Sequence, residues 1–83
     1  MTATTGARMR KIICTHLGVH ADDITDDKRL SDMGADSMDR MEITMEIEDE
    51  FEINISDSDA EANVTFDSTI GSLTAFVDKM MAR

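Results

Sequence analysis

The stretch that decides the fold reads Met33-Gly34-Ala35-Asp36-Ser37-Met38-Asp39. Asp36 is a favourable N-cap residue, and Asp39 three positions later completes an approximate capping box, so a helix is predicted to begin at Ser37. Gly34 can adopt backbone angles that would strain other residues just before this start. A serine in the first helical turn lies beside unpaired backbone N–H groups and the positive end of the helix dipole. The stretch therefore predicts an outward-pointing hydroxyl at a place that favours an attached phosphate.

The helix that begins at Ser37 is predicted to extend to Phe51 and to have two apolar faces, because its side chains rotate by about 100° per residue. The face expected to meet the core consists of Ile43, Ile47 and Phe51. The opposite face carries a methionine stripe, Met38, Met41 and Met45. The acidic residues that border the stripe are Asp39, Glu42, Glu46 and Asp49. On composition alone, two interpretations of the stripe are equally good. The methionines either fill a gap under the long loop or form an exposed surface that contacts a partner.

The motif Gly34-Ala35-Asp36-Ser37-Met38-Asp39, together with segments on both sides of it, resembles the acyl carrier proteins. The matching downstream segments are Met41-Glu42-Ile43, Glu48-Asp49-Glu50-Phe51 and Ile55-Ser56-Asp57. The matching upstream segments are Lys11-Ile12-Ile13, Leu17-Gly18-Val19 and Asp22-Asp23-Ile24-Thr25. Because these segments follow the family's order, the resemblance covers nearly the whole chain.

The resemblance implies that Ser37 is the substrate of another enzyme. In the family, the serine at this position carries 4′-phosphopantetheine through a phosphodiester, and the terminal thiol of that arm holds acyl groups as thioesters. A phosphopantetheinyl transferase would supply the group from coenzyme A. Further expected partners are acyl synthases, transferases or other acyl-processing enzymes. The implied function is delivery of acyl chains to fatty acid or related lipid biosynthesis.

The resemblance also implies a partner surface and an acyl pocket. The family meets its enzymes through this helix, so basic docking patches are expected to contact Asp36, Met38, Asp39, Met41, Glu42, Met45, Glu46 and Asp49. The acyl chain is expected to lie between helices, in a pocket lined by Ile43, Ile47, Phe51, Ile55, Ile70 and Phe76. Burial of an apolar chain is favoured by about 0.8 kcal/mol per methylene, which shields a thioester yet lets partners extract it.

The whole chain, residues 1–83, is predicted to be one all-α domain, a four-helix bundle like that of the acyl carrier proteins. Helices are expected over residues 8–17, 37–51 and 57–62, and from residue 69 onward. Residues 1–6 are expected to be a frayed end. Residues 19–33 lack helical periodicity and form a long loop between the first two helices, held to the core by isolated apolar side chains. The segment of residues 63–68, after the short third helix, is longer than the family pattern requires.

The net charge of −10 is unevenly distributed, because residues 36–61 contain eleven acidic residues and a single basic one, Arg40. Such a charge density repels nucleic acids and anionic membrane surfaces and attracts basic proteins. The chain has no apolar run long enough to cross a bilayer and no secretory h-region. Its one cysteine, Cys14, cannot form an internal disulfide. The sequence predicts a cytoplasmic monomer with protein partners, without nucleic-acid binding or membrane insertion.

Two patterns in the sequence resemble metal sites, but no metal site is predicted. The pattern Asp57-x-Asp59-x-Glu61-x-Asn63 resembles the start of an EF-hand loop, but Ala62 and Ser68 occupy the positions of the glycine and the bidentate glutamate. The other candidate ligands are Cys14, His16 and His20. The first two point to different sides of the predicted helix, and Gly18 separates that helix from the third. All three are interpreted as ordinary surface residues.

Besides a carrier for fatty acid synthesis, the sequence leaves two other functions open. The methionine-rich helix, Thr44 and the longer segment of residues 63–68 favour a dedicated carrier for polyketide, peptide or specialised lipid synthesis, whereas the acidity favours fatty acids. In the other alternative the chain is an acidic helical adaptor, and Ser37 is a helix-start residue or a phosphorylation site. No histidine lies in the local motif of Ser37, so no nucleophile with a positioned base is predicted. The chain is therefore expected not to be an enzyme.

Overall fold

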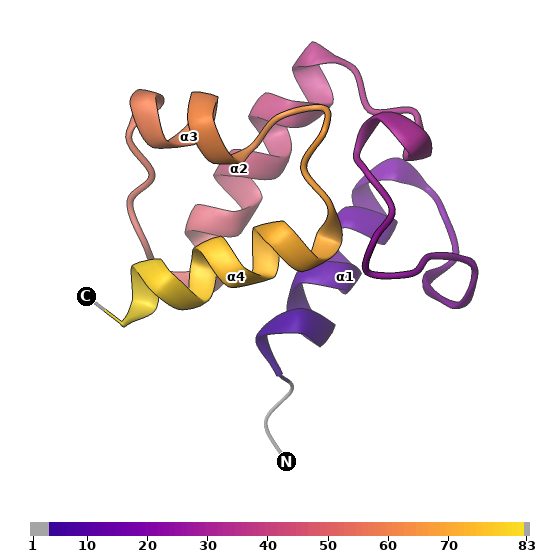
Figure 1. The fold of residues 1–83 in the computed structure, drawn as a ribbon, viewed down its shortest axis with the longest axis horizontal. Coiled ribbons are helices and arrows are strands. Elements are labelled where there is room, and N and C mark those ends of the chain that lie inside the picture. Colours follow the sequence, from indigo (N-terminus) through magenta and orange to yellow (C-terminus); the bar gives the residue numbers. More distant parts are fainter. Residues whose placement is uncertain (1–3, 83) are drawn as a thin grey trace.

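The computed structural model describes residues 4–82, which form four α-helices and no β-strand (Figure 1). The helices are α1 (Thr5–Leu17), α2 (Ser37–Phe51), α3 (Asp57–Asn63) and α4 (Ile70–Met81). The long loop between α1 and α2 contains two short 3₁₀ helices, η1 (Ala21–Asp23) and η2 (Ser31–Met33). The predicted class, an all-α four-helix bundle with a long first loop and a short third helix, is confirmed.

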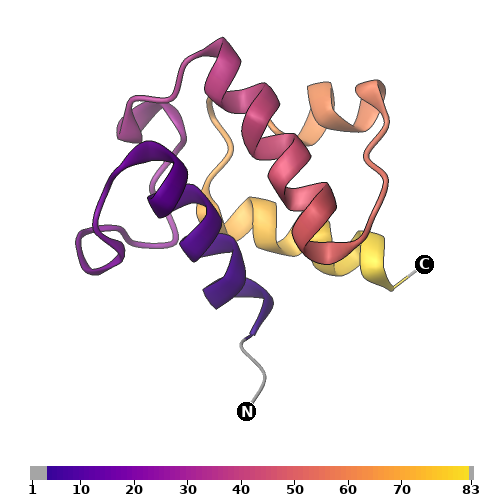
Figure 2. The same cartoon turned by 180° about the vertical axis from the view of Figure 1, so that it is seen from behind.

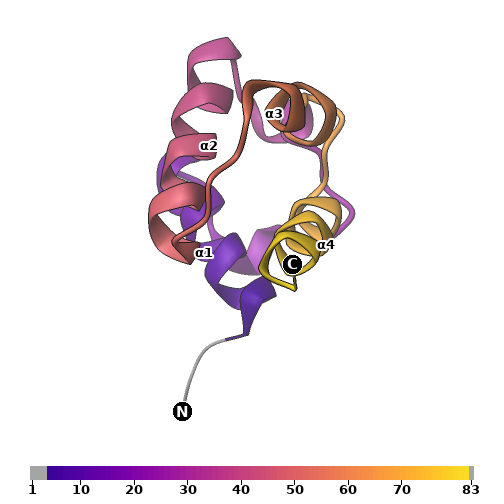
Figure 3. The same ribbon diagram turned by 90° about the vertical axis from the view of Figure 1, so that its left-hand side faces the viewer.

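The helices surround one apolar core. α1 packs against both α2 and α4, and α3 packs against α4. Figure 3 shows α2 on one side of the bundle and α3 and α4 on the other, and Figure 2 shows α1 and α2 from behind. The buried side chains of the core are Met9, Ile13, Leu30, Ile43, Ile47, Phe51, Ile55, Val64, Ile70, Leu73 and Val77. Among the described residues, none of the helices has the length and apolar character needed to span a membrane.

The first helix begins before the predicted residue 8. Thr4 caps α1 because its Oγ1 accepts a hydrogen bond from the N–H of Ala7 (3.1 Å), and the helix therefore starts at Thr5. Residues 4–6, which were expected in a frayed end, form this cap and the first turn. Residues 1–3 lie outside the described part of the chain. The predicted second helix is correct at both ends, and the third ends one residue later than predicted.

The long loop is fastened to the segment between α3 and α4 by main-chain hydrogen bonds. The N–H of Leu30 donates to the carbonyl of Ser68 (2.9 Å), and the N–H of Ser31 donates to the carbonyl of Phe66 (3.0 Å). Two further bonds run in the opposite direction, from the first N–H groups of α4 to carbonyls of loop residues 26 and 28. Leu30 is also fully buried. The loop that leads to Ser37 is therefore held by the α3–α4 segment.

Ser68 anchors the segment between α3 and α4. Its side chain is buried, and its Oγ donates a hydrogen bond to the carbonyl of Asn63 (2.8 Å). The same Oγ accepts a hydrogen bond from the N–H of Thr65 (2.9 Å). Because this buried hydroxyl has a hydrogen-bond partner both as donor and as acceptor, its burial does not leave an unpaired polar group that would destabilise the fold. The segment between α3 and α4 therefore forms a defined turn against the long loop.

The end of α2 allows a test of backbone strain. Glu52 ends this helix with a φ of 53° and is the one non-glycine residue with positive φ in the described range 4–82. The left-handed conformation costs an L-residue roughly 1–2 kcal/mol, so Glu52→Gly is expected to raise the free energy of unfolding by about 0.5–1 kcal/mol. Gly34→Ala, at a φ of 82°, is expected to lower it by about 1 kcal/mol. Urea unfolding measures both variants, and changes of the same sign would contradict this explanation.

Candidate functional site

The candidate site lies at the start of α2, where Ser37 is the first helical residue and is exposed. Asp36 is the N-cap, and its Oδ1 accepts the N–H of Asp39 (2.8 Å). In return, Oδ2 of Asp39 accepts the N–H of Asp36 (3.0 Å). The predicted capping box is therefore present, and Gly34 precedes it in a left-handed conformation. These contacts set Ser37 at the positive end of the α2 dipole.

The charge of Asp39 is determined by its neighbours. The hydrogen bond from the N–H of Asp36 lowers the pKa of the Asp39 carboxyl below its ordinary value. Partial desolvation acts in the opposite direction, and a hydrogen bond with His16 lowers this pKa further. An aspartate is ionised at neutral pH even without these contacts, and the contacts extend its ionised range to lower pH, so the surface next to Ser37 is negative.

The two apolar faces predicted for α2 are present in the structure. Ile43 and Ile47 are fully buried, and Phe51 is 6% exposed. The methionine stripe faces solvent, with exposed fractions of 67% for Met38, 66% for Met41 and 57% for Met45. The stripe is therefore not a second packing face within the described residues. Its role in binding partners stays a prediction.

Arg40, near the start of α2, lies on the same side of the helix as Ile43 and Ile47 and extends to the segment between α3 and α4. Its guanidinium carbon lies 5.5 Å from the centre of the Phe66 ring, within the range of a cation–π contact. Phe66 belongs to the segment between α3 and α4 and is 38% exposed. This contact connects the first turns of α2 to that segment.

A hollow of about 350 Å³ opens between α2 and α3. The residues that line it are Arg40, Met41, Thr44, Met45, Glu48, Ile55, Asp57, Ala60, Glu61 and Val64. On both helices these residues recur at spacings of three or four, a signal that is present in the sequence but that the two-face interpretation of α2 overlooked. The lining mixes charged, hydroxyl and apolar side chains. The hollow adjoins the methionine stripe through Met41 and Met45.

The residues expected to line an acyl pocket lie mostly in the closed core. The buried members are Ile43, Ile47, Phe51, Ile55 and Ile70. Phe76 is half-buried and lines a separate hollow between α3 and α4. Of the whole set, only Ile55 also lines the hollow between α2 and α3. An acyl chain among the buried members would require the helices to separate, so this pocket stays a prediction.

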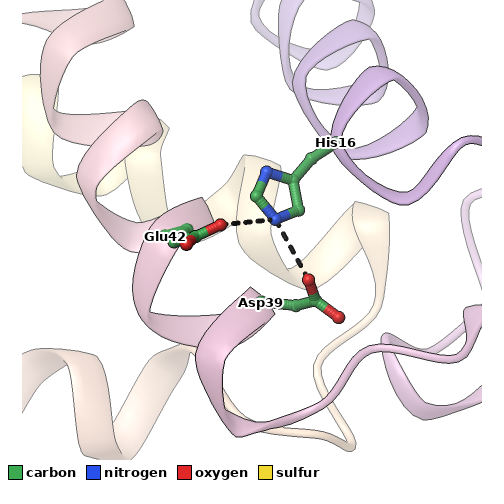
Figure 4. Close-up of side chains that lie close together, drawn as sticks. All are labelled: His16, Asp39 and Glu42. Atoms are coloured by element: carbon green, nitrogen blue, oxygen red, sulfur yellow. Dashed lines mark hydrogen bonds and ion pairs between the residues drawn. The ribbon is translucent and has the colours of Figure 1, made fainter.

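His16 on α1 contacts three acidic residues of α2 (Figure 4). Its Nε2 lies 3.2 Å from Oδ1 of Asp39 and 3.2 Å from Oε2 of Glu42. Its Nδ1 lies 2.9 Å from Oε2 of Glu46. The side chain is only 13% exposed, so the prediction of an ordinary surface residue was wrong. Packing of α1 on α2, which the sequence does not reveal directly, brings the imidazole against the acidic border of the methionine stripe.

Cys14 and His20, the other two candidate metal ligands, differ in their exposure to solvent. Cys14 is buried, contrary to prediction, because it lies on the inward side of α1. Burial raises the pKa of its thiol, although Arg10 acts in the opposite direction. His20 is exposed, as predicted. Cys14 is therefore a core residue with little thiolate character at neutral pH.

The pattern that resembles an EF-hand forms a helix. Residues 57–63 are α3, with Ser56 as the N-cap accepting the N–H of Asp59 (3.1 Å). An EF-hand requires these residues in a loop that wraps around the ion. The helix therefore excludes an EF-hand at this position.

The structure is a small helical domain with an exposed serine at the start of α2. The model of the family described as "Phosphopantetheine attachment site" matches residues 7–77, which is most of the chain, and the chain therefore belongs to this family. Carrier domains of this family hold covalently attached 4′-phosphopantetheine. They work with phosphopantetheinyl transferases and acyl-processing enzymes and are generally non-catalytic.

Proposed function

We propose that this protein is an acyl carrier protein in which Ser37 carries 4′-phosphopantetheine. The observation that carries the proposal is the exposed hydroxyl at the first turn of α2, inside the matched residues 7–77. The first-turn N–H groups and the positive end of the helix dipole favour a phosphodiester there. The group, taken from coenzyme A by a separate transferase, supplies a thiol that holds acyl chains as thioesters.

In this proposal Ser37 is a substrate and not a catalyst. A nucleophilic serine needs a base that accepts its proton within hydrogen-bond distance. The carboxylates of Asp36 and Asp39 accept main-chain N–H groups of the cap instead. The imidazole of His16 contacts carboxylates of α2. These contacts support a non-catalytic carrier.

The partner surface that we propose is the methionine stripe with its acidic border, together with Asp36. Its apolar centre and acidic rim complement an apolar patch surrounded by basic residues, as expected on a transferase or synthase. The exposure of the three methionines supports this surface. Because Glu42 and Glu46 contact His16, Asp36 and Asp49 are the more accessible charges of the strip.

Mass spectrometry of the intact protein tests the attachment. The unmodified chain is incubated with coenzyme A and a broad-specificity phosphopantetheinyl transferase, and one phosphopantetheine per chain is expected. A reaction without transferase controls for coenzyme A bound through the thiol of Cys14. If the chain gains no mass while the same transferase modifies a reference carrier, the alternative of an acidic helical adaptor is favoured.

Reversal of one charge on the strip is expected to slow this modification. Asp49→Lys opposes the approach of a basic partner, so the rate at low salt should fall on the order of tenfold and should depend less on ionic strength. Asp49 is exposed, and its replacement leaves the contacts of His16 intact. Asp78→Lys makes the same charge change on α4 and should alter the rate little. Equal slowing in both variants would show that net charge, and not this strip, controls association.

The pathway is a finer part of the proposal. The acidity supports general fatty acid or related lipid biosynthesis. A dedicated carrier for polyketide, peptide or specialised lipid synthesis is the second candidate, because Thr44 and Glu48 make the hollow beside α2 suitable for a polar acyl group. A cytoplasmic location fits the free thiol of Cys14. The intact mass of protein purified from its own cells, with its acyl group attached, would distinguish the two pathways.

A further inference from the structure

Metal-ligating side chains from two helices converge beside the start of α2. Nε2 of His16 lies 3.2 Å from both Oδ1 of Asp39 and Oε2 of Glu42 (Figure 4). These ligand atoms all lie within 4.8 Å of one another. Asp39 and Glu42 are three residues apart and share one face of α2, whereas His16 comes from α1. The cluster therefore combines an imidazole and two carboxylates on helices that pack against each other.

The tautomer of His16 follows from its contact with Glu46. Nδ1 lies 2.9 Å from Oε2 of Glu46, and an ionised carboxylate only accepts hydrogen bonds, so Nδ1 carries a proton. Nε2 likewise lies against carboxylates, those of Asp39 and Glu42, so without a metal ion it donates a hydrogen bond to Oδ1 of Asp39 (3.2 Å). Electron-rich atoms at this spacing require a positive charge among them, which is either a second proton on the ring or a metal ion. A metal ion bound here would take the place of the proton on Nε2 of His16.

The spacing of the ligand atoms suits a metal ion. Zinc lies about 2.0–2.2 Å from nitrogen and oxygen ligands in tetrahedral sites, which sets neighbouring ligand atoms about 3.3 Å apart. The two distances of 3.2 Å from Nε2 of His16 agree with that geometry. Water would complete the coordination. An imidazole ligand favours a transition-metal dication over Mg²⁺ or Ca²⁺, which take oxygen ligands.

Outer contacts hold the ligands in position. Glu46 on Nδ1 of His16 completes the carboxylate–histidine–metal arrangement that orients the ring. The N–H of Asp36 holds Oδ2 of Asp39 (3.0 Å), so that Oδ1 faces His16. From these contacts we propose that His16, Asp39 and Glu42 form a binding site for a transition-metal dication such as Zn²⁺. The site revises the expectation of no metal ligand in this chain.

Occupation of the site would change the surface that partners meet. Asp39 is two residues from Ser37, and both carboxylates belong to the acidic border of the methionine stripe. A bound dication neutralises these two charges and so reduces the attraction of a basic enzyme toward Ser37. This consequence rests on the proposed carrier function, whereas the metal site itself does not.

Calorimetric titration of Zn²⁺ into the unmodified chain, without coenzyme A or transferase, tests the site. We expect the wild type to bind one Zn²⁺ per chain. For His16→Gln and for Glu42→Gln we expect the Kd for Zn²⁺ to be at least about tenfold higher. Glu46→Ala retains the three ligands but loses the contact that orients the ring, so it should weaken binding by about ten- to one-hundredfold. His20→Gln is the matched control, because His20 is exposed after α1 and should not affect the Kd.

Equal affinity of the wild type and His16→Gln for Zn²⁺ would overturn the proposal, as would an equal loss in His20→Gln. If His16→Gln melts at a lower temperature than the wild type, its loss of affinity could come from the damaged fold. The test is then ¹⁵N NMR of the His16 imidazole in the wild type. Zn²⁺ must then shift Nε2 of His16 and leave Nδ1 protonated, and an unshifted Nε2 refutes the site. Neither measurement uses the modification of Ser37, so failure of the metal site and failure of the carrier function are separate outcomes.

Discussion

Ser37→Ala will take up no phosphopantetheine while it keeps the helical fold. The hydroxyl of Ser37 is the proposed attachment atom, and the cap that starts α2 is made by Asp36 and Asp39, which the substitution leaves in place. Alanine is also a strong helix former, so α2 should not be weakened. Intact mass after incubation with coenzyme A and transferase measures the modification, and circular dichroism measures the fold.

A second variant, Ser56→Ala, tests whether the loss of modification is specific to Ser37. Ser56 is also exposed and also lies at a helix start, as the N-cap of α3, so Ser56→Ala should accept one phosphopantetheine as the wild type does. Addition of the group to Ser37→Ala at any other hydroxyl would disprove the assignment of the site. Loss of modification in both variants would point to a defect of the fold and not of the attachment residue.

Ile47→Ala is expected to lower the free energy of unfolding by about 2–5 kcal/mol, as core deletions do. Ile47 is fully buried in the cluster that joins α2 to the other helices. Small domains have total stabilities of roughly 0.05–0.15 kcal/mol per residue, so the variant should lose a large fraction of its stability. Urea unfolding, with the rate of Ser37 modification measured in the same samples, gives both quantities.

Met45→Ala on the other face of the same helix provides the comparison. Its side chain is 57% exposed, so its truncation should change the free energy of unfolding by less than about 0.5 kcal/mol. Its rate of modification should nevertheless fall if the methionine stripe contacts the transferase. A Met45→Ala chain that unfolds, beside a stable Ile47→Ala chain, would reverse the assignment of the two faces.

The start of α2 could be predicted from the sequence because its causes are local. The residues that cap the helix, Asp36 and Asp39, lie within one turn of Ser37, and the structure has both hydrogen bonds of the predicted box. The period of the apolar residues likewise separated the buried Ile47 from the exposed Met45. Local sequence signals of this kind need no knowledge of how the helices pack.

The features that could not be predicted depend on contacts between distant segments. The environment of His16 is set by the packing of α1 on α2, so its 13% exposure could not be read from its neighbours in sequence. Burial of Cys14 has the same origin. The hollow between α2 and α3 requires the relative placement of two helices, although the spacing of Arg40, Thr44 and Glu48 was visible. The early start of α1 was missed for a different reason, because Thr4 was not recognised as an N-cap.

The fastening of the long loop by main-chain atoms bears on how this chain can change in evolution. The bonds from Leu30 and Ser31 to the α3–α4 segment use N–H and carbonyl groups, which every residue except proline provides. Replacement of the exposed side chains of loop residues 27–29 therefore leaves these bonds in place, whereas the side chain of Asp26 is also paired with Arg10 of α1. Substitutions in this loop are therefore restricted at Leu30, whose side chain is buried, and at positions where proline would remove a donating N–H group. Exposed charges of residues 27–29 can change without loss of these bonds, and the loop surface can thereby come to match different partners.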